Sequence, residues 1–361
     1  MTRYAARSPL LDAPGAVVAE GVDAGVAAHY GDPMREQRLL SEGLAAVDLS
    51  HRGVVTVAGP DRLSWLHSMT TQSLTDLAPG AGAESLVLSP NGHVEHALHV
   101  VDDGTTTWLT VEPGTAPVLI AWLERMRFML RVEVADVTGG YAVVGEPFGV
   151  PAATAAGEPL AWVDPWPGVV DPVPSGRAGR IAAYGPVQGH PATGRAWRES
   201  IVPRAELQAF VGDRALAGMW AAEALRVAAW RPRLGFETDH RTLVQEVDWL
   251  RSAVHLHKGC YRGQEAVARV HNLGNPPRRL VFLHLDGSGH VLPERGAEVF
   301  GAGMPSGRAI GVVTSVARHA ELGPIALALV KRSTPVDAAL VVADGAGGPG
   351  IAAAQEVIVA P

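Results

Sequence analysis

The stretch from Lys258 to Glu265, Lys-Gly-Cys-Tyr-Arg-Gly-Gln-Glu, holds the residues of this chain with the most distinctive chemistry. Cys260 is the only cysteine among 361 residues, and Lys258 is one of only two lysines. Positive charge stabilises a thiolate, so the neighbouring Lys258 and Arg262, together with a helix that begins near Gly263, favour ionisation of Cys260. We therefore predict that Cys260 and Lys258 carry the chemistry, with Cys260 as a nucleophile or soft ligand.

The remaining residues of this motif are small or polar. We expect Gly259, Tyr261, Gly263, Gln264 and Glu265 to shape the motif and to supply its hydrogen bonds. The alternative is that the cysteine is a buried small hydrophobe without chemical function, as lone cysteines often are. The flanking glycines and cations favour the functional interpretation.

Two further kinds of site overlap the same stretch. His255 and His257 precede Cys260 closely enough to suggest a metal site, but the spacing is not that of a standard zinc site, and we predict no permanent metal. A local excess of cations instead suits carboxylates or phosphates, unless it is merely a solvated face. Its members are Lys258, Arg262, Arg269, Arg278 and Arg279, against Glu265 alone.

The bulk composition is that of a folded globular protein, with 47% hydrophobic and 19% charged residues. The formal net charge of −7 provides no global basic field for nucleic acid. A single cysteine excludes an intramolecular disulfide. The first 31 residues lack an apolar signal-peptide core, and no window approaches the roughly 20 apolar residues of a membrane span. We expect a cytoplasmic protein without a membrane partner.

The hydrophobic pattern predicts mixed helices and strands before residue 277 and strands after it. Ser89-Pro90-Asn91-Gly92 predicts a hairpin turn, because Asn-Gly tolerates the positive φ that such turns require. Helices are expected at Met34–Leu44, after an N-cap at Asp61, over 116–130, at Met219–Ala229 with Pro232 ending it, and at Gln264–Val270. Strands are expected at Val54–Val57, Leu98–Val101, Thr105–Val111, Val132–Val134 and Leu160–Val163.

Three boundaries divide the chain. Residues 1–34 are expected to form a loosely organised lead-in. Nine prolines between residues 145 and 191 mark an insertion or a seam within the domain. Asn275-Pro276-Pro277 precedes short apolar runs separated by turns, the pattern of a small β-barrel or sandwich. These runs are Leu280–Leu285, Ala309–Val316, Ile325–Val330, Leu340–Val342 and Gln355–Val359.

The motif at 258–265 resembles the signature of the YgfZ-type folate-binding proteins, which are similar to the aminomethyltransferase (T-protein) of the glycine cleavage system. Supporting segments are Asp48-Leu49-Ser50-His51-Arg52-Gly53, the following Val57 to Asp61 with Trp65-Leu66, and Ala222-Glu223-Ala224-Leu225-Arg226-Val227 running to Pro232. The similarity covers roughly residues 35–361 and is weakest at 145–191. It implies an α+β folate-binding domain at 35–277, built from mixed antiparallel sheets and helices, and a small C-terminal β-barrel at 278–361.

The resemblance also implies tetrahydrofolate, or a one-carbon derivative, in the centre of the first domain. By position, Glu199 matches the family carboxylate that grips the pterin, and a carboxylate can accept two parallel N–H bonds from an aminopyrimidine edge. Trp220 would stack on the pterin and Arg226 would meet the folate glutamate. Each of these residues also has a purely structural alternative. Glu199 would lie at the rim before a strand, Trp220 would pack in the core, and Arg226 would cover its own helix.

The chain departs from the family where the T-protein carries an Asp pair after its hairpin turn. Here His96-Ala97 stands at that place, and the position of a family Asn corresponds to Glu112. We assign His96 and Glu112 to the pocket as the residues that replace the family ones. Glu95 would substitute for the missing Asp only if the register slipped by one, which in a strand turns a side chain to the opposite face.

The resemblance implies a folate-binding protein that supports the assembly or repair of iron–sulfur clusters, and thereby tRNA-modifying and other cluster enzymes. Its partners would be folate and iron–sulfur proteins or assembly factors. One alternative is an active tetrahydrofolate-dependent aminomethyltransferase or demethylase, which the loss of the Asp pair disfavours. The other is an interaction module that uses the basic 258–279 face without folate.

Overall fold

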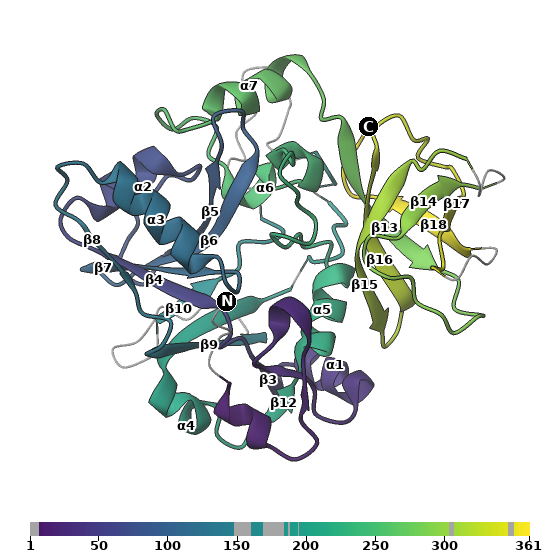
Figure 1. Cartoon of the computed structure of the whole chain (residues 1–361), viewed down its shortest axis with the longest axis horizontal. Coiled ribbons are helices and arrows are strands. Elements are labelled where there is room, and N and C mark those ends of the chain that lie inside the picture. Colours follow the sequence, from purple (N-terminus) through teal and green to yellow (C-terminus); the bar gives the residue numbers. More distant parts are fainter. Residues whose placement is uncertain are drawn as a thin grey trace.

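The computed structural model describes residues 7–147, 160–168, 184–186, 188–193, 195–302, 307–345 and 350–361. Three lobes surround the middle of the molecule: two five-stranded sheets, each covered by helices, and a barrel (Figure 1). Among the described residues, no helix is long and apolar enough to cross a membrane.

The first lobe is an antiparallel sheet in the order β5-β6-β7-β4-β8. Its strands are β4 (Gly53–Ala58), β5 (Gly82–Leu88), β6 (Val94–Asp102), β7 (Thr106–Val111) and β8 (Glu133–Asp136). Helices α2 (Arg62–Met69) and α3 (Ala116–Met126) cover one face. Alternate strand residues such as Val57 and Leu98 pack there against Leu66 and Leu119.

The second lobe is a mixed sheet in the order β10-β11-β9-β3-β12, in which only the β12–β3 pair is parallel. Its elements are α1 (Pro33–Ser41), β3 (Ala45–Asp48), β9 (Tyr141–Pro147), β10 (Leu160–Val163), β11 (Trp197–Pro203), η3 (Arg204–Glu206), α4 (Leu207–Val211), β12 (Ala215–Ala217) and α5 (Met219–Ala228). Leu40 of α1 and Ala221 of α5 pack on one face, and Leu207 of α4 packs on the other.

The lead-in is more ordered than the sequence suggested. It contains η1 (Pro9–Asp12), β1 (Val17–Val18), η2 (Gly21–Asp23) and β2 (Ala27–His29). Leu10 and Val26 are buried in the core of the second lobe, which explains the order. The expectation of a loose N-terminal segment is therefore wrong for residues 7–34.

The third lobe is a closed antiparallel barrel of six strands in the order β13-β16-β15-β14-β17-β18. The strands are β13 (Arg278–Leu285), β14 (Glu298–Gly301), β15 (Gly311–His319), β16 (Gly323–Lys331), β17 (Leu340–Val342) and β18 (Ile351–Val357). Closure removes the unpaired edges that an open sheet would present. The predicted α+β class and the small C-terminal barrel are confirmed.

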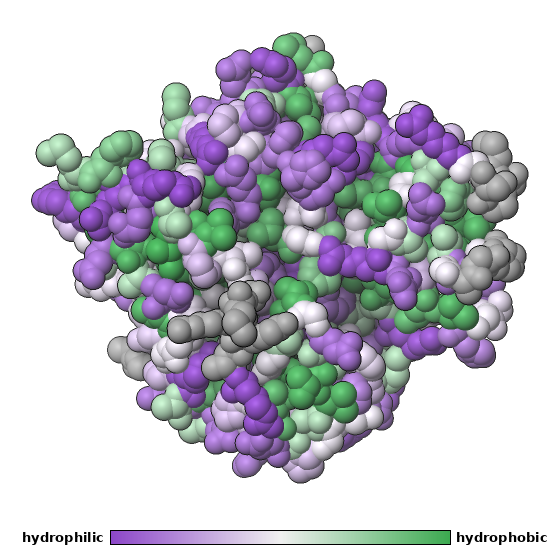
Figure 2. Space-filling model, in the orientation of Figure 1, coloured by the Kyte–Doolittle hydropathy of each residue, from purple (hydrophilic) through white to green (hydrophobic). Residues whose placement is uncertain are grey.

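A shared core joins the barrel to the other lobes. Leu327 and Leu329 of β16 pack with Ala224 of α5 and with Val244 and Leu250. The last two belong to η4 (Val244–Val247) and α6 (Leu250–Ala253), and α7 (Gln264–Leu273) follows them. Figure 2 shows that hydrophilic and hydrophobic side chains are mixed over one face of the whole assembly.

The predicted hairpin turn packs directly on the cysteine motif. Gly92 adopts φ +79°, and a Cβ atom there would lie 2.8 Å from the Ala266 side chain. Gly263 adopts φ +83°, and a Cβ atom on it would lie 2.6 Å from the Ser89 carbonyl oxygen. Both positions therefore need glycine for backbone conformation and for space. The motif glycine holds the β5–β6 hairpin against the start of α7.

Most predicted elements are present with shifted ends. Helix α5 stops at Ala228 because Trp230 adopts φ +58°, before Pro232 can end it. Asp61 is the N-cap residue of α2, but its carboxylate bonds Arg131 instead of the helix backbone. Strand β14 was not predicted. The proline-rich 145–191 region lies largely outside the described residues, although Leu160–Val163 is a strand as expected.

Candidate functional site

Glu199 lies at the centre of the molecule, on strand β11, with 2% of its surface exposed. One guanidinium nitrogen of Arg52 lies 2.8 Å from each of its carboxylate oxygens. The Nδ1 atom of His99 is 2.7 Å from Oε2, and the indole N–H of Trp197 donates to Oε1 at 3.3 Å. Burial alone would raise the pKa of Glu199, but Arg52 and His99 hold it well below its usual range. The carboxylate is therefore anionic.

Aromatic rings flank this carboxylate. Trp162 of β10 is the register partner of Glu199, and its ring stacks on His99 with centroids 3.7 Å apart and planes 5° from parallel. The indole N–H of Trp162 donates to the Ala83 carbonyl oxygen at 2.9 Å, which fixes the ring. Two strands of one sheet and one strand of the other thus converge on Glu199.

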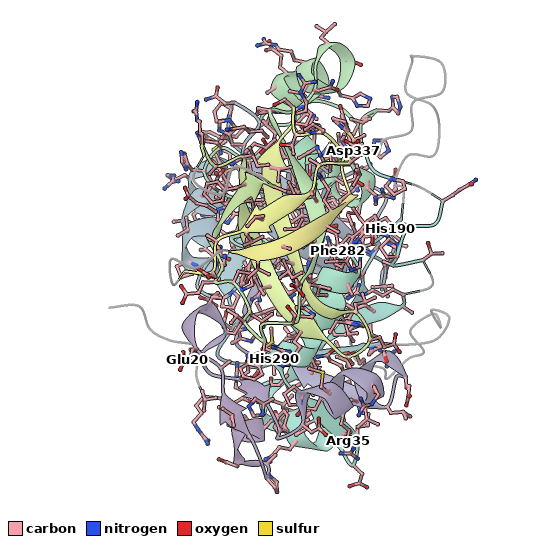
Figure 3. The ribbon with its side chains drawn as sticks, turned by 90° about the vertical axis from the view of Figure 1, so that its right-hand side faces the viewer. Glu20, Arg35, His190, Phe282, His290 and Asp337 are labelled. Carbon is pink, nitrogen blue, oxygen red and sulfur yellow. The ribbon has the colours of Figure 1, made fainter. Side chains whose placement is uncertain are left out.

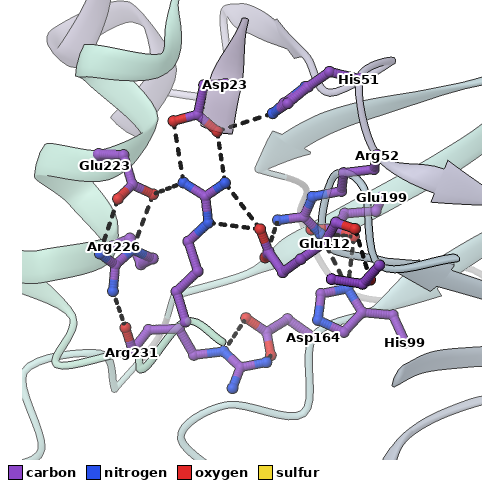
Figure 4. A network of polar contacts seen from close by, with 12 residues as sticks. Asp23, His51, Arg52, His99, Glu112, Asp164, Glu199, Glu223, Arg226 and Arg231 are labelled. Atoms are coloured by element: carbon purple, nitrogen blue, oxygen red, sulfur yellow. Dashed lines mark hydrogen bonds and ion pairs between the residues drawn. The ribbon is translucent and has the colours of Figure 1, made fainter. Parts of the chain in front are cut away.

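A chain of ion pairs extends from Glu199 toward the lead-in (Figure 4). Arg52 also lies 3.8 Å from Glu112, and Glu112 accepts from Arg233 at 2.9 Å. Arg233 in turn donates to Asp23 at 2.6 Å, and Asp23 lies 3.0 Å from His51. These groups are buried together because each charge has an opposite charge as its neighbour.

The central pocket formed by these residues is small and balanced in charge. Its free volume is about 70 Å³, and five arginines and five carboxylates line it. The arginines are Arg52, Arg195, Arg226, Arg231 and Arg233, and the carboxylates are Glu84, Glu112, Asp164, Glu199 and Glu223. Each of these arginines pairs with at least one of these carboxylates.

Three of the residues predicted to contact folate line this pocket: Glu199, Glu112 and Arg226. The Arg226 guanidinium is held by Glu223 at 2.8 Å and by Glu237 at 3.0 Å. It therefore does more than cover its helix, since it links α5 to the barrel through Ser315 at 2.7 Å.

The other two predicted contacts lie elsewhere. His96 is the partner of Val87 in the β5–β6 ladder, on the face that packs against α2 and α3, while Ala97 lines the pocket. Burial lowers the pKa of His96 to about 4. Trp220 is 57% exposed and lines a different cavity. The assignment of both residues to the central pocket is wrong, because neighbouring positions of a strand or helix face different sides.

The Lys258 ammonium group is bound by backbone carbonyl oxygens. It donates to the backbone carbonyl oxygens of Thr70 at 2.6 Å and Gln72 at 2.9 Å, and to that of His67. The three N–H donors of the ammonium thus meet three acceptors at the end of α2. Only 8% of the side chain is exposed, and burial lowers its pKa to about 8. These bonds leave no donor for the Cys260 thiolate.

The other motif residues point in several directions. Cys260 and Gly259 are exposed, whereas Tyr261 is buried in the shared core, where burial raises its pKa. Arg262 pairs with Glu95 at 3.0 Å. Glu95 sits where the β5–β6 register shifts, and this ion pair directs it outward. Gln264 begins α7 half-buried, and the exposed Glu265 pairs with Arg269 one helical turn later.

The five cations between Lys258 and Arg279, which the sequence suggested as a site for carboxylates or phosphates, do not form one surface. Arg279 is fully buried in the barrel, where it donates to the Thr334 carbonyl oxygen. Arg278 pairs with Asp239 and Glu246, and the remaining cations have the partners described above. Among the described residues, no group of three or more His, Cys, Asp or Glu side chains is placed to hold a metal. The rings of His255 and His257 lie 6.4 Å apart.

Sequence reasoning assigned no role to Arg52, His99, Trp162, Trp197 or Arg233. A period-two signal was available for some of them, because Trp197 shares a strand face with Glu199, and His99 shares one with Ala97. The pairing of Arg52 with Glu199 joins two segments 147 positions apart, and no local pattern reports such a contact.

Comparison with known proteins finds similarities in sequence and in fold. Residues 10–145 match the family model of the GCVT N-terminal domain. The crystal structure of glycine cleavage system aminomethyltransferase T from Bartonella henselae superposes with a TM-score of 0.72 at 20% identity, over 98% of this chain and 95% of that one. Fold and sequence are aminomethyltransferase-like.

Relatives by sequence agree with this result. The aminomethyltransferase of Moorella thermoacetica is 27% identical over 327 residues, 85% of this chain and 83% of that protein. The chloroplastic Arabidopsis thaliana protein named transferase At1g60990 is 27% identical over 258 residues. That match spans 67% of this chain but only 56% of the plant protein, little more than half its length.

Tetrahydrofolate is the cofactor that an aminomethyltransferase-like protein implies. A buried anionic carboxylate between flat aromatic rings suits the aminopyrimidine edge of a pterin. The free volume of about 70 Å³ is far below the roughly 300 Å³ at which ligand pockets begin, and Arg52 already holds both oxygens of Glu199. The donor set therefore suits a pterin in its chemistry, whereas the free space in this arrangement is too small to hold one.

Proposed function

We propose that this chain binds a reduced folate, tetrahydrofolate or a one-carbon derivative, in the central pocket through Glu199. The observation that carries the proposal is the buried, anionic Glu199 at the centre of an aminomethyltransferase-like fold. In the described arrangement, Arg52 supplies the hydrogen bonds that a pterin edge would supply. A bound pterin would replace Arg52 at Glu199, and the guanidinium also lies 3.8 Å from Glu112.

Aminomethyl transfer is not part of the proposed function. Bound tetrahydrofolate would supply the nitrogen that accepts a one-carbon unit, and the family places an Asp beside it. Here Ala97 lines the pocket at that place, and an alanine can neither hold nor move a proton. Glu95 pairs with Arg262 and Glu112 with Arg233, so both candidate substitutes are already engaged.

The resemblance to YgfZ-type proteins also suggests a role for this chain in the cell. We infer that the chain supports the assembly or repair of iron–sulfur clusters in the cytoplasm, and thereby tRNA-modifying and other cluster enzymes. The exposed position of Cys260 supports this role, because an exposed thiol can reach a partner protein. Iron–sulfur proteins or assembly factors would be the partners.

Titration of tetrahydrofolate into the pure protein by calorimetry tests the binding proposal. We expect one saturable site per chain, and an absence of binding heat over a range of temperatures would contradict the proposal. Addition of a lipoyl-bound aminomethyl donor to the same complex should give no methylene-tetrahydrofolate above background. Turnover at about 1 s⁻¹ or faster would instead establish an active transferase.

A further inference from the structure

A second cavity lies apart from the central pocket, between helices α1 and α5 and the barrel. Its volume is about 530 Å³, within the range of small-molecule sites and several times that of the central pocket. Helix α5 packs against both α1 and β15, where the second lobe meets the barrel (Figure 1). Residues of all three elements line the cavity. Figure 3 shows the barrel from its outer side, with Glu20 and Arg35 of the N-terminal part toward its lower edge. Junctions between lobes are preferred places for ligand sites.

The walls of this cavity are mostly apolar and carry two aromatic rings. Trp220 of α5 is 57% exposed and lines the cavity together with Phe236, Met34, Leu292 and Val316. An exposed tryptophan beside a cavity offers a large, flat apolar surface on which a ligand ring can stack. The apolar side of α5 that includes Ala221 and Ala224 is buried in the cores, so Trp220 is not needed to hold the helix.

Positive charge lies at the rim of the cavity. The Arg295 guanidinium sits 4.4 Å from the centroid of the Phe236 ring, and it donates to the Gly235 carbonyl oxygen. The side chain of Arg318, at the end of β15, is exposed and has no ion-pair or hydrogen-bond partner among the described residues. A free guanidinium beside an apolar wall is suited to a carboxylate or a sulfonate.

The carboxylates that line the cavity do not cancel this charge. Asp23 is held by Arg233 at 2.6 Å, and Glu223 is held by Arg226 at 2.8 Å. Arg226 and Arg233 also pair with Glu237 and Glu112, so these acids belong to one buried ion-pair network. Arg295 and Arg318 at the rim have no carboxylate partner among the described residues. Glu223 also lines the central pocket, so its ion pair forms the wall between the two spaces.

We propose that this second cavity binds a planar aromatic anion. Its ring would lie against Trp220, and its anionic group would pair with Arg318. This site is distinct from the proposed folate site, because neither Trp220 nor Arg318 lines the central pocket.

The fluorescent probe 8-anilinonaphthalene-1-sulfonate, a planar aromatic anion, tests the proposal on the full chain. We expect one saturable site per chain. Trp220→Ala and Arg318→Glu should each weaken binding at least about ten-fold, the effect of losing roughly 1.4 kcal/mol. Both side chains are exposed, so the variants should keep the wild-type circular dichroism spectrum and melting temperature.

Matched controls lie on exposed positions away from the cavity. Met129→Ala removes a side chain that is 98% exposed, and Arg241→Glu reverses an exposed arginine. Both should leave the probe affinity unchanged, and Arg318→Glu should leave tetrahydrofolate binding unchanged. Absence of saturable binding, or an unchanged affinity in either Trp220→Ala or Arg318→Glu, would overturn the proposal.

Discussion

Arg52 and Glu199 form a buried ion pair in which one guanidinium nitrogen lies 2.8 Å from both carboxylate oxygens. The side chains are 12% and 2% exposed. In such a pair each charge depends on the other, and removing one partner typically costs about 3–5 kcal/mol. The pair keeps Glu199 anionic, and it also occupies the edge of the carboxylate that a pterin would use.

Lys258→Met should destabilise the protein without changing the thiol. The variant leaves the carbonyl oxygens of Thr70 and Gln72, and that of His67, without their donor, and we expect a loss of about 3 kcal/mol or more in the free energy of unfolding. Urea unfolding measures this change, and the rate of alkylation of Cys260 by iodoacetamide measures the thiol.

A matched control for this variant is Lys331→Met, since the other lysine donates to one carbonyl oxygen, that of Ala309. Its loss should be clearly smaller. If Lys258→Met retained wild-type stability and slowed alkylation several-fold, the lysine would serve the cysteine, as the sequence alone suggested.

The sequence predicted the elements that local pattern controls. The Asn91-Gly92 turn, the strand Leu160–Val163 and the barrel strands follow from turn chemistry and period-two alternation. The family resemblance also assigned Glu199 to the central pocket, and this residue lines it. Trp220 was misplaced because its position is one of many on a short helix, and nothing local tells which face meets the pocket.

The role of Lys258 was misjudged for a related reason. Its proximity to Cys260 in the sequence suggested contact, but the acceptors of the ammonium lie 186 to 191 positions away. The network of Arg52, His99 and Arg233 likewise joins three separate segments. Long-range contacts of this kind depend on the packing of whole lobes, which no motif of eight residues contains.

His96 should make the fold sensitive to acid. Burial lowers the pKa of His96 to about 4, from 6.5 in the unfolded chain, so the folded state disfavours the charged ring. The unfolded state then binds more protons below pH 6.5, and stability falls as the pH drops from about 6.5 toward 4. The share of His96 is about 3 kcal/mol at most.

His96→Leu should therefore flatten the plot of unfolding free energy against pH over this interval, as measured by urea unfolding. Replacement of the exposed His240 by Leu is the control and should keep the wild-type slope. An equal slope in His96→Leu and wild type would mean that another group, such as the buried His190, accounts for the loss.

Cys260→Ser should leave the fold and folate binding intact, because the side chain is exposed and lies outside the set that lines the central pocket. A serine hydroxyl is neither ionised nor soft near neutral pH, so thiolate chemistry would be lost. The activity of a cluster-dependent enzyme, measured in cells that lack the gene, should not recover with this variant. Full recovery with Cys260→Ser would remove the thiol from the function.

Arg52→Ala should bind tetrahydrofolate more tightly than wild type, although the free protein is less stable. The arginine competes with the pterin for Glu199, while His99, 2.7 Å from the carboxylate, also holds its pKa low and stays in place in the variant. Removal of Arg52 should therefore raise the fraction of protein that can bind the pterin, and we expect a gain in affinity of about five-fold or more. Calorimetry measures the affinity. A weaker affinity would show that Arg52 belongs to the folate site and does not compete with it.

The most direct measurement of the central proposal is the affinity of Glu199→Gln for tetrahydrofolate, determined by calorimetry beside wild type and the exposed control Glu265→Gln. The glutamine keeps the shape of the side chain and removes its charge, and the loss of one charged hydrogen-bond partner typically costs about 1.5–3 kcal/mol. We predict a ten- to hundred-fold weaker affinity in Glu199→Gln, roughly the equivalent of that energy, and no change in Glu265→Gln. A folded Glu199→Gln protein that binds tetrahydrofolate as tightly as wild type would contradict the account.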